Sequence, residues 1–386
     1  MKILIIANGY PDRQSPQWGC FEKDQALALK TIGHDVTMMY VDRRFRTFWR
    51  KIGITKRKTE QGIFVYGMFY LPLGWLCNKL SYKIHQKIVM WLFDKLYQVY
   101  VKERGKPDII YAHYIWNISF ASVLKRKYGI PLVGLEHWSG LNKDELTSVA
   151  RYWGNMAYSN VDKLIAVANP LRERILSHFK IDSVVIHNMI GEEFLNIPIH
   201  EKKESGKISF ISVGSLLPVK GYDILINAMS LATKELPSWS LIIIGEGPEH
   251  DRLQQLINNK GLSGQITLVG RKTKPEIIQY LNASSLYISS SRSENFSVSV
   301  LEALAVGLPV IATLCGGIKE CINDSNGVLV PVENVLELSQ ALVIISSGLA
   351  KYDNKQISED CLHRFAPHVI ARQLTVVFAE VINHRQ

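Results

Sequence analysis

Residues 289–310 read SSSRSENFSVSVLEALAVGLPV. An apolar run, Leu286–Ser290, leads into the polar loop of this stretch, and apolar side chains then recur at helical spacing from about Ser297 to Val306. Gly307 is typical of a helix end, and a second apolar run, Pro309–Ala312, follows at once. A strand, a helix and a second strand in this order predict a βαβ unit, and therefore a parallel sheet.

The same alternation continues on both sides of this stretch. The predicted strands are short and almost wholly apolar, as in parallel sheets that are buried on both faces. The first series is Ile3–Ala7, Val36–Val41, Ile109–Ala112, Leu132–Leu135, Leu164–Val167 and Val184–Ile186. The second series is Ile208–Val213, Leu241–Ile244, Ile266–Val269, Leu286–Ser290, Pro309–Ala312 and Gly327–Val330. The pattern predicts an α/β protein with two doubly wound sheets.

A polar, charged segment separates the two series. It reads HEKKESG at residues 200–206, and we interpret it as an interdomain linker. A chain of 386 residues also exceeds what one hydrophobic core usually serves. We therefore expect residues 1–199 to form one domain and residues 200–366 a second. Two such domains would bind a ligand in the cleft between them, at the carboxyl ends of their strands.

Positive charge is concentrated in the first half of the chain. Residues 1–200 contain 28 lysines and arginines against 17 acidic residues, whereas the whole chain contains 45 against 35. The second half is therefore nearly neutral. This asymmetry predicts an anionic partner for the first half, which could be nucleic acid, an anionic membrane surface or a phosphorylated substrate.

Neither the cysteines nor the apolar stretches indicate a metal centre or a membrane span. The five cysteines include no pair at the two-residue spacing of zinc and redox sites, so reduced thiols in a reducing cytosol are expected. Residues 1–7 form too short an apolar run for a signal peptide. The longest uncharged stretch, residues 61–78, contains helix-breaking glycines and a proline, and Phe64-Val65-Tyr66 within it indicates a strand. A spanning helix needs about 20 predominantly apolar residues.

Two glycine turns of the second half are candidates for phosphate binding. Residues 210–222 read FISVGSLLPVKGY, where Lys220 lies just before a predicted helix. A helix end and a lysine together suit a phosphate, although a solvated surface lysine is the alternative. Residues 241–248 read LIIIGEGP, and His250 stands where a dinucleotide motif has its third glycine. That argues against a nicotinamide cofactor, and a simple tight turn is the alternative.

Two glutamates of the opening stretch suit different tasks. Glu294 lies in the predicted loop and Glu302 in the predicted helix. A carboxylate can accept strong hydrogen bonds from a pair of sugar hydroxyls, and the amides around Phe296 and Ser297 would point at a pyrophosphate. An alternative for Glu302 is a capping box with Ser299.

With these residues the chain resembles family four of the retaining GT-B glycosyltransferases. The signature of that family is two glutamates separated by seven residues, an alanine-rich helix and Gly-x-Pro-Val, and Glu294, Glu302 and residues 302–310 match it. The resemblance covers most of the chain and is densest from Val213 to Gly317. It implies two Rossmann-like domains facing a central cleft, with the C-terminal helix, residues 367–386, crossing back to complete the first domain.

The resemblance also implies roles for single residues. Glu302 would hold the donor ribose, Glu294 would contact the transferred sugar, and Lys220 would neutralise the diphosphate. His137, which ends the stretch LVGLEH, would contact the donor sugar or the reaction centre, with a structural histidine as the alternative. His113 is expected to be structural. The implied donor site comprises Gly19, Gly214, Ser215, Lys220, Gly247, Arg271, Asn295, Phe296, Ser297, Val298 and Glu302.

Two positions depart from the pattern of the family. Ser215 stands where the family commonly has an arginine, so a cation of the diphosphate clamp would have to come from Arg271 or Arg292. Asn295-Phe296-Ser297 replaces the common Gly-Phe-Gly, which could change the sugar that is accepted.

A basic and aromatic stretch follows the second predicted strand. Residues 42–60 suit an anionic membrane interface or a lipid-phosphate acceptor. Single-stranded nucleic acid and a solvated loop are alternatives, and the resemblance favours the membrane. The candidate patch comprises Arg43, Arg44, Arg46, Trp49, Arg50 and Lys51.

The sequence therefore predicts a retaining hexosyl- or N-acetylhexosaminyl-transferase that acts in bacterial surface polysaccharide assembly. A UDP- or GDP-sugar would be the donor, and a glycan or a lipid-diphosphate-linked glycan the acceptor. No Asp-x-Asp motif occurs, so we expect no metal and no cofactor. The protein would lie at the inner face of the cell membrane and bind no nucleic acid. A GT-B sugar-nucleotide epimerase and a non-enzymatic nucleic-acid-binding protein are the alternatives.

Overall fold

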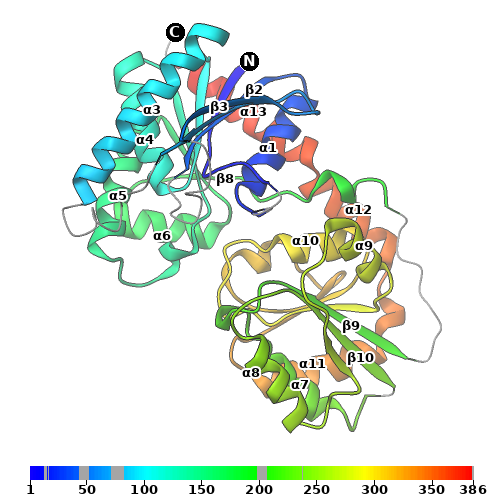
Figure 1. Ribbon diagram of the computed structural model, residues 1–386. Coiled ribbons are helices and arrows are strands. Elements are labelled where there is room, and N and C mark those ends of the chain that lie inside the picture. Colours follow the sequence, from blue (N-terminus) through cyan, green and yellow to red (C-terminus); the bar gives the residue numbers. More distant parts are fainter. Residues whose placement is uncertain are drawn as a thin grey trace. The chain divides into compact units, whose positions relative to one another are not determined.

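The computed structural model describes residues 1–12, 15, 17–42, 52–70, 82–197, 207–236 and 238–384. The chain divides into two compact units, which Figure 1 shows in the colours of the sequence. Unit 1 comprises Met1–Ile186 with Pro367–Gln386, and unit 2 comprises His187–Ala366. The C-terminal segment therefore belongs to the unit in which the chain begins.

Unit 1 contains an eight-stranded sheet of order β3-β4-β2-β1-β5-β6-β7-β8. Neighbouring strands are parallel except for β3, which pairs antiparallel with β4. The strands are β1 (Lys2–Ile6), β2 (Asp35–Asp42), β3 (Gly53–Lys58), β4 (Phe64–Phe69), β5 (Ile109–His113), β6 (Leu132–Glu136), β7 (Lys163–Ala166) and β8 (Val184–Val185). The helices are α1 (Cys20–Thr31), α3 (Tyr82–Arg104), α4 (Ile115–Tyr128), α5 (Ser148–Tyr158), α6 (Asn169–Phe179) and α13 (Pro367–Asn383), with a short 3-10 helix η2 (Ser139–Asn142).

The core of unit 1 includes side chains from the far end of the chain. In Figure 1, α13 lies beside α1 in this unit. The ring of Phe378 in α13 meets the ring of Tyr111 in β5 edge-on, with 5.0 Å between centroids. His34 Nε2 lies 2.8 Å from Thr375 Oγ1. Since Phe378 and Leu374 are buried completely or almost so, α13 is a structural part of unit 1.

Residues Asn354–Asn383 are, by length and composition alone, apolar enough to span a membrane. They form two helices, because Ala366 between them is extended, with φ −64° and ψ 148°. Half of their most apolar window is buried inside the protein. The core packing of α13 accounts for that part of the apolar composition.

Unit 2 contains a six-stranded sheet of order β11-β10-β9-β12-β13-β14, in which every pair is parallel. The strands are β9 (Ile208–Val213), β10 (Trp239–Ile244), β11 (Ile266–Leu268), β12 (Leu286–Ser289), β13 (Val310–Thr313) and β14 (Gly327–Val330). The α-helices are α7 (Tyr222–Ala232), α8 (His250–Asn259), α9 (Lys274–Asn282), α10 (Val298–Ala305), α11 (Val335–Ser347) and α12 (Asn354–Phe365). The 3-10 helices are η3 (Glu192–Phe194), η4 (Pro218–Lys220), η5 (Gly316–Glu320) and η6 (Leu349–Lys351).

The division between the units falls after Ile186 rather than after residue 199. The ring of His187 stacks on Phe296 with 4.4 Å between centroids, and Asn188 Nδ2 donates a hydrogen bond of 2.9 Å to the carbonyl of Phe296. The amide of Ile190 donates to Phe365 O at 3.1 Å. These contacts attach residues 187–190 to unit 2. The segment 200–206, interpreted as a linker, lies outside the described residues.

Two doubly wound, Rossmann-like sheets confirm the predicted fold class. Each predicted strand occurs, with its ends moved by at most two residues. The sequence pattern missed β3, which lies inside the basic segment 42–60. Lys56, Arg57 and Lys58 are exposed in this edge strand, and charged edge strands resist pairing with other chains.

Candidate functional site

The carboxyl ends of β9 and β12 mark the point in unit 2 where the strand order reverses. The chain continues from β9 to β10 and β11 on one side, and from β12 to β13 and β14 on the other. Loops diverge at such a point, and ligands of open α/β sheets bind there. Lys220 lies in the loop after β9 and Glu294 in the loop after β12. This end of the sheet is therefore the candidate site.

Lys220 and Glu294 form an ion pair at this point. Lys220 Nζ donates to Glu294 Oε1, and Ser291 Oγ donates to the same oxygen at 2.9 Å. The lysine and glutamate side chains are 23% and 16% exposed, so a ligand can reach both. The structure thus brings together two of the three residues predicted as catalytic. Their roles stay predictions.

The backbone beside Lys220 is packed tightly against the neighbouring loop. Gly221 has φ 63°, and a Cβ at this position would lie 2.1 Å from Ser290 O. Ser290 Oγ also donates to Lys220 O at 3.0 Å. A side chain at position 221 would therefore force the two loops apart and move Lys220 away from Glu294.

Arg292 holds this loop pair together. Its guanidinium donates to both carboxylate oxygens of Asp223, at 3.0 and 3.1 Å, in the two-pronged geometry that suits arginine. It also donates to Glu333 and to the carbonyl of Pro218 in η4. The carboxylates of Asp223 and Glu333 thus already form ion pairs with Arg292. This favours Arg271, which is exposed after β11, as the second cation of a diphosphate clamp.

We expect Arg292→Gln to lower kcat/KM for the donor about 10- to 100-fold. The variant loses the hydrogen bonds that hold the loop of Lys220, and a small misplacement of a group that contacts the reacting atoms lowers the rate strongly. Arg252→Gln is the matched control. Arg252 also contacts Asp223 and Glu249, but no contact of its side chain with η4 is seen among the described residues. The two kinetic constants and the melting temperature would be measured for both variants. Unchanged constants in Arg292→Gln would contradict the positioning role.

Glu302 lies on α10 with its side chain only 3% exposed, and it forms an ion pair with Lys274, the first residue of α9. Burial raises the pKa of Glu302, and Lys274 opposes that increase. The helix begins at Val298 with Ser297 as its N-cap. Glu302 is therefore beyond the first turn, and the alternative interpretation of Glu302, a capping box with Ser299, is wrong.

The loop between Glu294 and α10 is anchored on both sides. Phe296, stacked on His187, is 4% exposed. On the other side a Cβ at Gly316, which has φ 56°, would lie 1.8 Å from Glu294 O, and the amide of Gly317 donates to Asn295 O at 2.8 Å. The predicted donor-binding loop is thus rigidly placed, and the amino end of α10 follows it directly.

The two predicted glycine turns pack on each other. A Cβ at Gly245 would lie 1.8 Å from Gly214 O, and one at Gly247 would lie 2.3 Å from Leu216 O. Ser215, which lies between Gly214 and Leu216, is exposed. This close backbone contact gives the glycines a structural reason of their own, so the tight-turn alternative explains Gly245 and Gly247 without a ligand.

In unit 1 the middle strands end in a cluster of buried aromatic and acidic side chains. The ring of His137, which follows β6, lies over Tyr114 with 3.9 Å between centroids, and His113 of β5 is 5.6 Å away. Tyr114 has φ 68°, which is rare for a residue other than glycine and marks local strain. Burial lowers the pKa of His137 to about 3. His137 is therefore neutral at neutral pH and can act through hydrogen bonds but not through charge.

Glu136 holds the turn that presents His137. Its Oε1 accepts from the amides of His137 and Trp138 at 2.9 and 2.8 Å, and its Oε2 accepts from Tyr158 Oη at 2.6 Å. The side chain is fully buried. Burial raises the pKa of Glu136 to about 7 in spite of these hydrogen bonds.

Glu136→Gln is expected to change how stability depends on pH. A carboxyl with a raised pKa in the folded state stabilises the protein below its unfolded pKa, and that contribution is lost as pH rises to the folded pKa. The window here runs from about pH 4.5 to about pH 7. The free-energy difference between wild type and variant should fall by about 3 kcal/mol across it. Denaturant unfolding at several pH values measures this, with the exposed Glu145→Gln as control. A difference that is constant with pH would contradict the assignment.

The loop after β1 carries Gly19, which was predicted to contact the donor. Gly19 has φ 78°, and a Cβ there would lie 2.3 Å from Gly9 O. Trp18 Nε1 donates to Asn8 O at 2.9 Å, and the Asn8 amide donates to the buried Glu22 at 3.0 Å. Trp116 at the start of α4, just after β5, also donates to Asn8 Oδ1 at 2.7 Å. The loop is thus held against the starts of α1 and α4, and a ligand contact of Gly19 stays a prediction.

The basic patch falls outside the described residues. It comprises Arg43, Arg44, Arg46, Trp49, Arg50 and Lys51. The described part of the same segment contributes to the fold of unit 1, since Lys56 pairs with Glu103 of α3 and the Arg57 guanidinium lies 4.2 Å from the centre of the Tyr10 ring.

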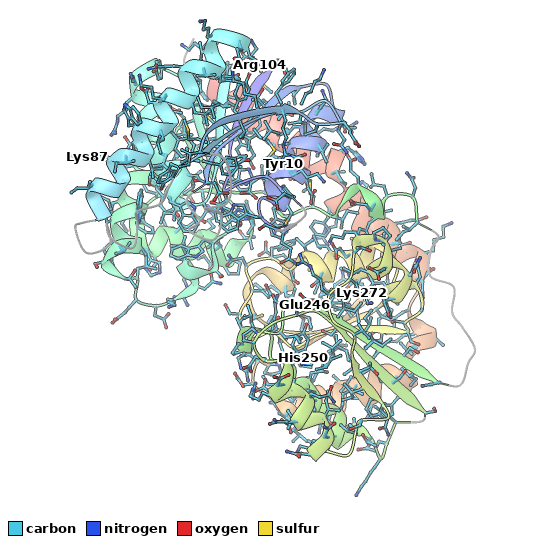
Figure 2. All side chains as sticks on the ribbon, in the orientation of Figure 1. Tyr10, Lys87, Arg104, Glu246, His250 and Lys272 are labelled. Atoms are coloured by element: carbon cyan, nitrogen blue, oxygen red, sulfur yellow. The ribbon has the colours of Figure 1, made fainter. Side chains whose placement is uncertain are left out.

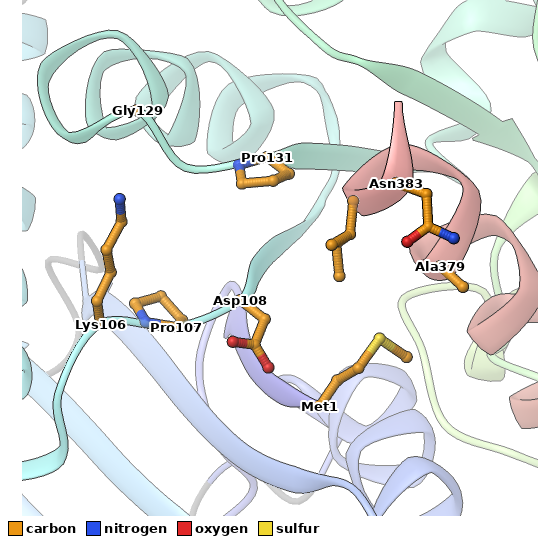
Figure 3. A pocket seen from close by; sticks show the side chains of 9 residues that line it. Met1, Lys106, Pro107, Asp108, Gly129, Pro131, Ala379 and Asn383 are labelled. Atoms are coloured by element: carbon orange, nitrogen blue, oxygen red, sulfur yellow. The ribbon is translucent and has the colours of Figure 1, made fainter. Parts of the chain in front are cut away.

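A hollow of about 600 Å³ lies at the amino ends of the strands of the unit 1 sheet (Figure 3). Met1, Asp108 and Pro131, which line it, precede the neighbouring strands β1, β5 and β6. Asp108 faces it but also accepts the Lys2 amide at 2.7 Å. Because ligands of such sheets bind at the carboxyl ends of the strands, this hollow is not part of the candidate site.

Sequence reasoning missed Lys274 and Glu136. Thr273 and Glu276 form a capping box around the start of α9, and this helix-start signal was readable in the sequence. This signal would have placed Lys274 at the start of a helix. No pattern in the sequence indicates that Lys274 pairs with Glu302. Glu136 was part of the quoted stretch that ends in His137, where an acid at the end of an apolar strand was itself a signal.

Comparison with known proteins is consistent with this geometry. Residues 26–194 match the family model described as Glycosyltransferase Family 4, and residues 195–354 match Glycosyl transferases group 1. An uncharacterized glycosyltransferase of Methanocaldococcus jannaschii is 30% identical over 61% of this chain and 64% of its own length. A Bacillus subtilis protein, provisionally named teichuronic acid biosynthesis glycosyltransferase TuaC, is 26% identical over 92% of this chain and 90% of its own.

A solved structure of Alr3699/HepE of Anabaena, in complex with UDP-glucose, has a similar fold. Its TM-score is 0.72 at 20% identity, over 98% of this chain and 100% of that one. Together the two family models match adjacent stretches that span both units. The chain is therefore a glycosyltransferase of the GT-B fold.

Proposed function

We propose that this enzyme is a retaining glycosyltransferase that moves a hexosyl or N-acetylhexosaminyl group from a nucleoside diphosphate sugar to a hydroxyl. The observation that carries the proposal is the pair of lysine–carboxylate contacts in unit 2, Lys220 with Glu294 and Lys274 with Glu302. Cations and carboxylates in adjacent loops suit a ligand that combines a diphosphate with sugar hydroxyls. The UDP and UDP-glucose bound by Alr3699/HepE support a nucleotide sugar as the donor, and we propose a UDP- or GDP-sugar.

Lys220, Glu302 and Glu294 would each bind a different part of the donor. Lys220 neutralises the charge that grows on the departing diphosphate, and a preorganised cation of this kind is usually the largest catalytic contribution. Glu302 accepts hydrogen bonds from the ribose, and Glu294 accepts them from the transferred sugar. The leaving phosphate takes the acceptor proton, so no side chain needs to act as the base. The acceptor hydroxyl attacks the sugar carbon directly, so no side chain needs to act as nucleophile. Attack on the face that the diphosphate leaves retains the anomeric configuration.

Unit 1 would serve the acceptor. His137 is half-buried and neutral, because desolvation lowers its pKa to about 3, and it acts as a hydrogen-bonding group toward the substrates. The excess of positive charge in the first half of the chain suits a lipid-diphosphate-linked glycan. The name of the Bacillus subtilis relative supports a role in bacterial surface polysaccharide assembly, and hence a place at the inner face of the cell membrane.

A panel of UDP- and GDP-sugars tests the proposal. We expect one donor to raise the melting temperature and to be consumed when a membrane extract is added, with the anomeric configuration of the product unchanged by NMR. An inverted product would contradict retention. Conversion of the donor to an epimeric sugar nucleotide without acceptor would establish an epimerase instead, and binding of nucleic acid that survives Glu294→Ala would favour the non-enzymatic alternative.

Transfer is expected to proceed undiminished in excess EDTA, because Lys220 rather than a divalent ion would stabilise the leaving group. The initial rate with and without chelator measures this, after the same treatment of a metal-dependent glycosyltransferase as a control for the assay. Loss of activity on chelation, restored by Mg²⁺ or Mn²⁺, would contradict metal independence.

A further inference from the structure

The outward face of α3 carries large apolar side chains where a surface helix normally carries polar ones. Ile84, Ile88 and Trp91 are 46%, 40% and 57% exposed. They are spaced by four and three residues, so they lie along one stripe of the helix. The inward face already supplies the core of unit 1 through Val89, Leu92, Phe93, Leu96, Tyr97 and Tyr100. The outward apolar residues therefore contribute nothing to that core.

Lysines continue the same stripe. Lys87, Lys95 and Lys102 follow the helical spacing of the apolar residues, and all are exposed. Figure 2 shows Lys87 on the outer side of α3, and Lys95 Nζ lies 5.9 Å from the centre of the Trp91 ring. Asp94, at the flank of the stripe, is ion-paired with Lys127 of α4 at 2.7 Å. The other acid of α3, Glu103, is paired with Lys56 of β3. The outward face of α3 is thus apolar and cationic, and both acids of the helix are paired with lysines.

We propose that this stripe, defined as Ile84, Lys87, Ile88, Trp91 and Lys95, docks unit 1 onto an anionic membrane surface. Isoleucine and tryptophan side chains enter the boundary between headgroups and acyl chains, while lysines reach back to lipid phosphates. Each cation near such a surface adds to binding. Charge complementarity selects this occupant, because the stripe and the first half of the chain are both positive.

The inference deepens the proposed function, since an enzyme held on the membrane by unit 1 meets a lipid-linked acceptor there. It differs from the patch predicted at residues 43–51, because it rests on described residues of α3 alone. Nucleic acid is less well matched, because two of the three apolar side chains are aliphatic and offer no stacking surface for bases.

Co-sedimentation of the full chain with vesicles tests the inference. Vesicles of phosphatidylcholine with about one third phosphatidylglycerol should bind the wild type, and pure phosphatidylcholine vesicles should bind it about tenfold less. The variant Ile84→Ser, Ile88→Ser, Trp91→Ser should lose about tenfold or more of the binding. The control variant Leu231→Ser, Leu336→Ser, Ile344→Ser removes three side chains of unit 2 that are 54%, 59% and 65% exposed, and it should bind like the wild type.

Charge is tested separately with Lys87→Gln and Lys95→Gln together, which should remove most of the preference for anionic vesicles while leaving the apolar side chains in place. Equal sedimentation of the stripe and control variants would overturn the inference, and so would equal binding to neutral and anionic vesicles. Self-association that the stripe variant abolishes, seen by sedimentation velocity without vesicles, would show an interface with a second copy instead. All vesicle measurements omit donor and acceptor, and binding of UDP and GDP is measured in parallel, so failure of docking is distinguishable from failure of the proposed donor site.

Discussion

Lys220→Ala is expected to lower kcat by about 10²- to 10³-fold, the usual cost of removing one preorganised group that stabilises a developing negative charge. The effect should appear mainly in kcat, because the charge on the bridging oxygen of the diphosphate grows only as the sugar departs. The rate of donor consumption at saturating donor, with a membrane extract as the source of acceptor, measures it.

The matched control is Lys234→Ala, which removes an exposed lysine just beyond α7 in the same unit and should leave kcat unchanged. Lys220→Arg keeps the charge and should recover part of the rate. Because the lysine also pairs with Glu294, the variant Lys220→Ala, Glu294→Gln shows whether an unpaired carboxylate causes the loss. A decrease of less than about tenfold in Lys220→Ala would contradict the leaving-group role.

Glu302→Ala is expected to weaken nucleotide binding about 100-fold, or about 3 kcal/mol, because two hydrogen bonds from ribose hydroxyls to a charged, buried acceptor are lost. Titration calorimetry with UDP and GDP measures the dissociation constant. The sharpest control is the substrate itself. The wild type should bind a 2′-deoxynucleotide more weakly than the ribonucleotide. Glu302→Ala should bind the two nucleotides with the same affinity. An equal preference for ribose in both proteins would refute the assignment of Glu302.

The lysine beside Glu302 makes a further distinction possible. Burial raises the pKa of Glu302 and Lys274 lowers it, so Lys274→Ala should raise that pKa further. Since only the ionised carboxylate accepts both hydrogen bonds, nucleotide affinity should begin to fall at a higher pH in Lys274→Ala than in the wild type as the solution is acidified.

The fold was largely predictable because its strands are buried on both faces. β9, reading ISFISV, and β1, reading KILII, are mostly apolar, which is typical of strands in a parallel sheet that is covered on both faces. β3 was not predictable in this way. Its sequence GITKRK is polar and exposed, and it is a strand only because it pairs with β4 across the edge of the sheet. Pairing of that kind leaves no periodic signal in one segment.

Single residues of the candidate site were predictable from the segment in which they lie. Contacts between residues of different segments were not predictable. Glu294 and Lys220 were both identified in their own loops, and the structure places them in contact. The partner of Glu302 comes from α9, and the partners of Arg292 come from Asp223 and Glu333. Such pairs depend on the three-dimensional approach of loops that the sequence separates widely, so local patterns could not reveal them.

The return of α13 to unit 1 has a consequence for the order of folding during synthesis. Unit 2 is continuous, from His187 to Ala366, so all of it is translated before α13. Unit 1 cannot complete its core before then, because the buried Phe378 and Leu374 are translated after the whole of unit 2. Unit 1 is therefore completed only after unit 2 has been made, and translation that stops just after Ala366 would give a product with a finished unit 2 and an incomplete, aggregation-prone unit 1.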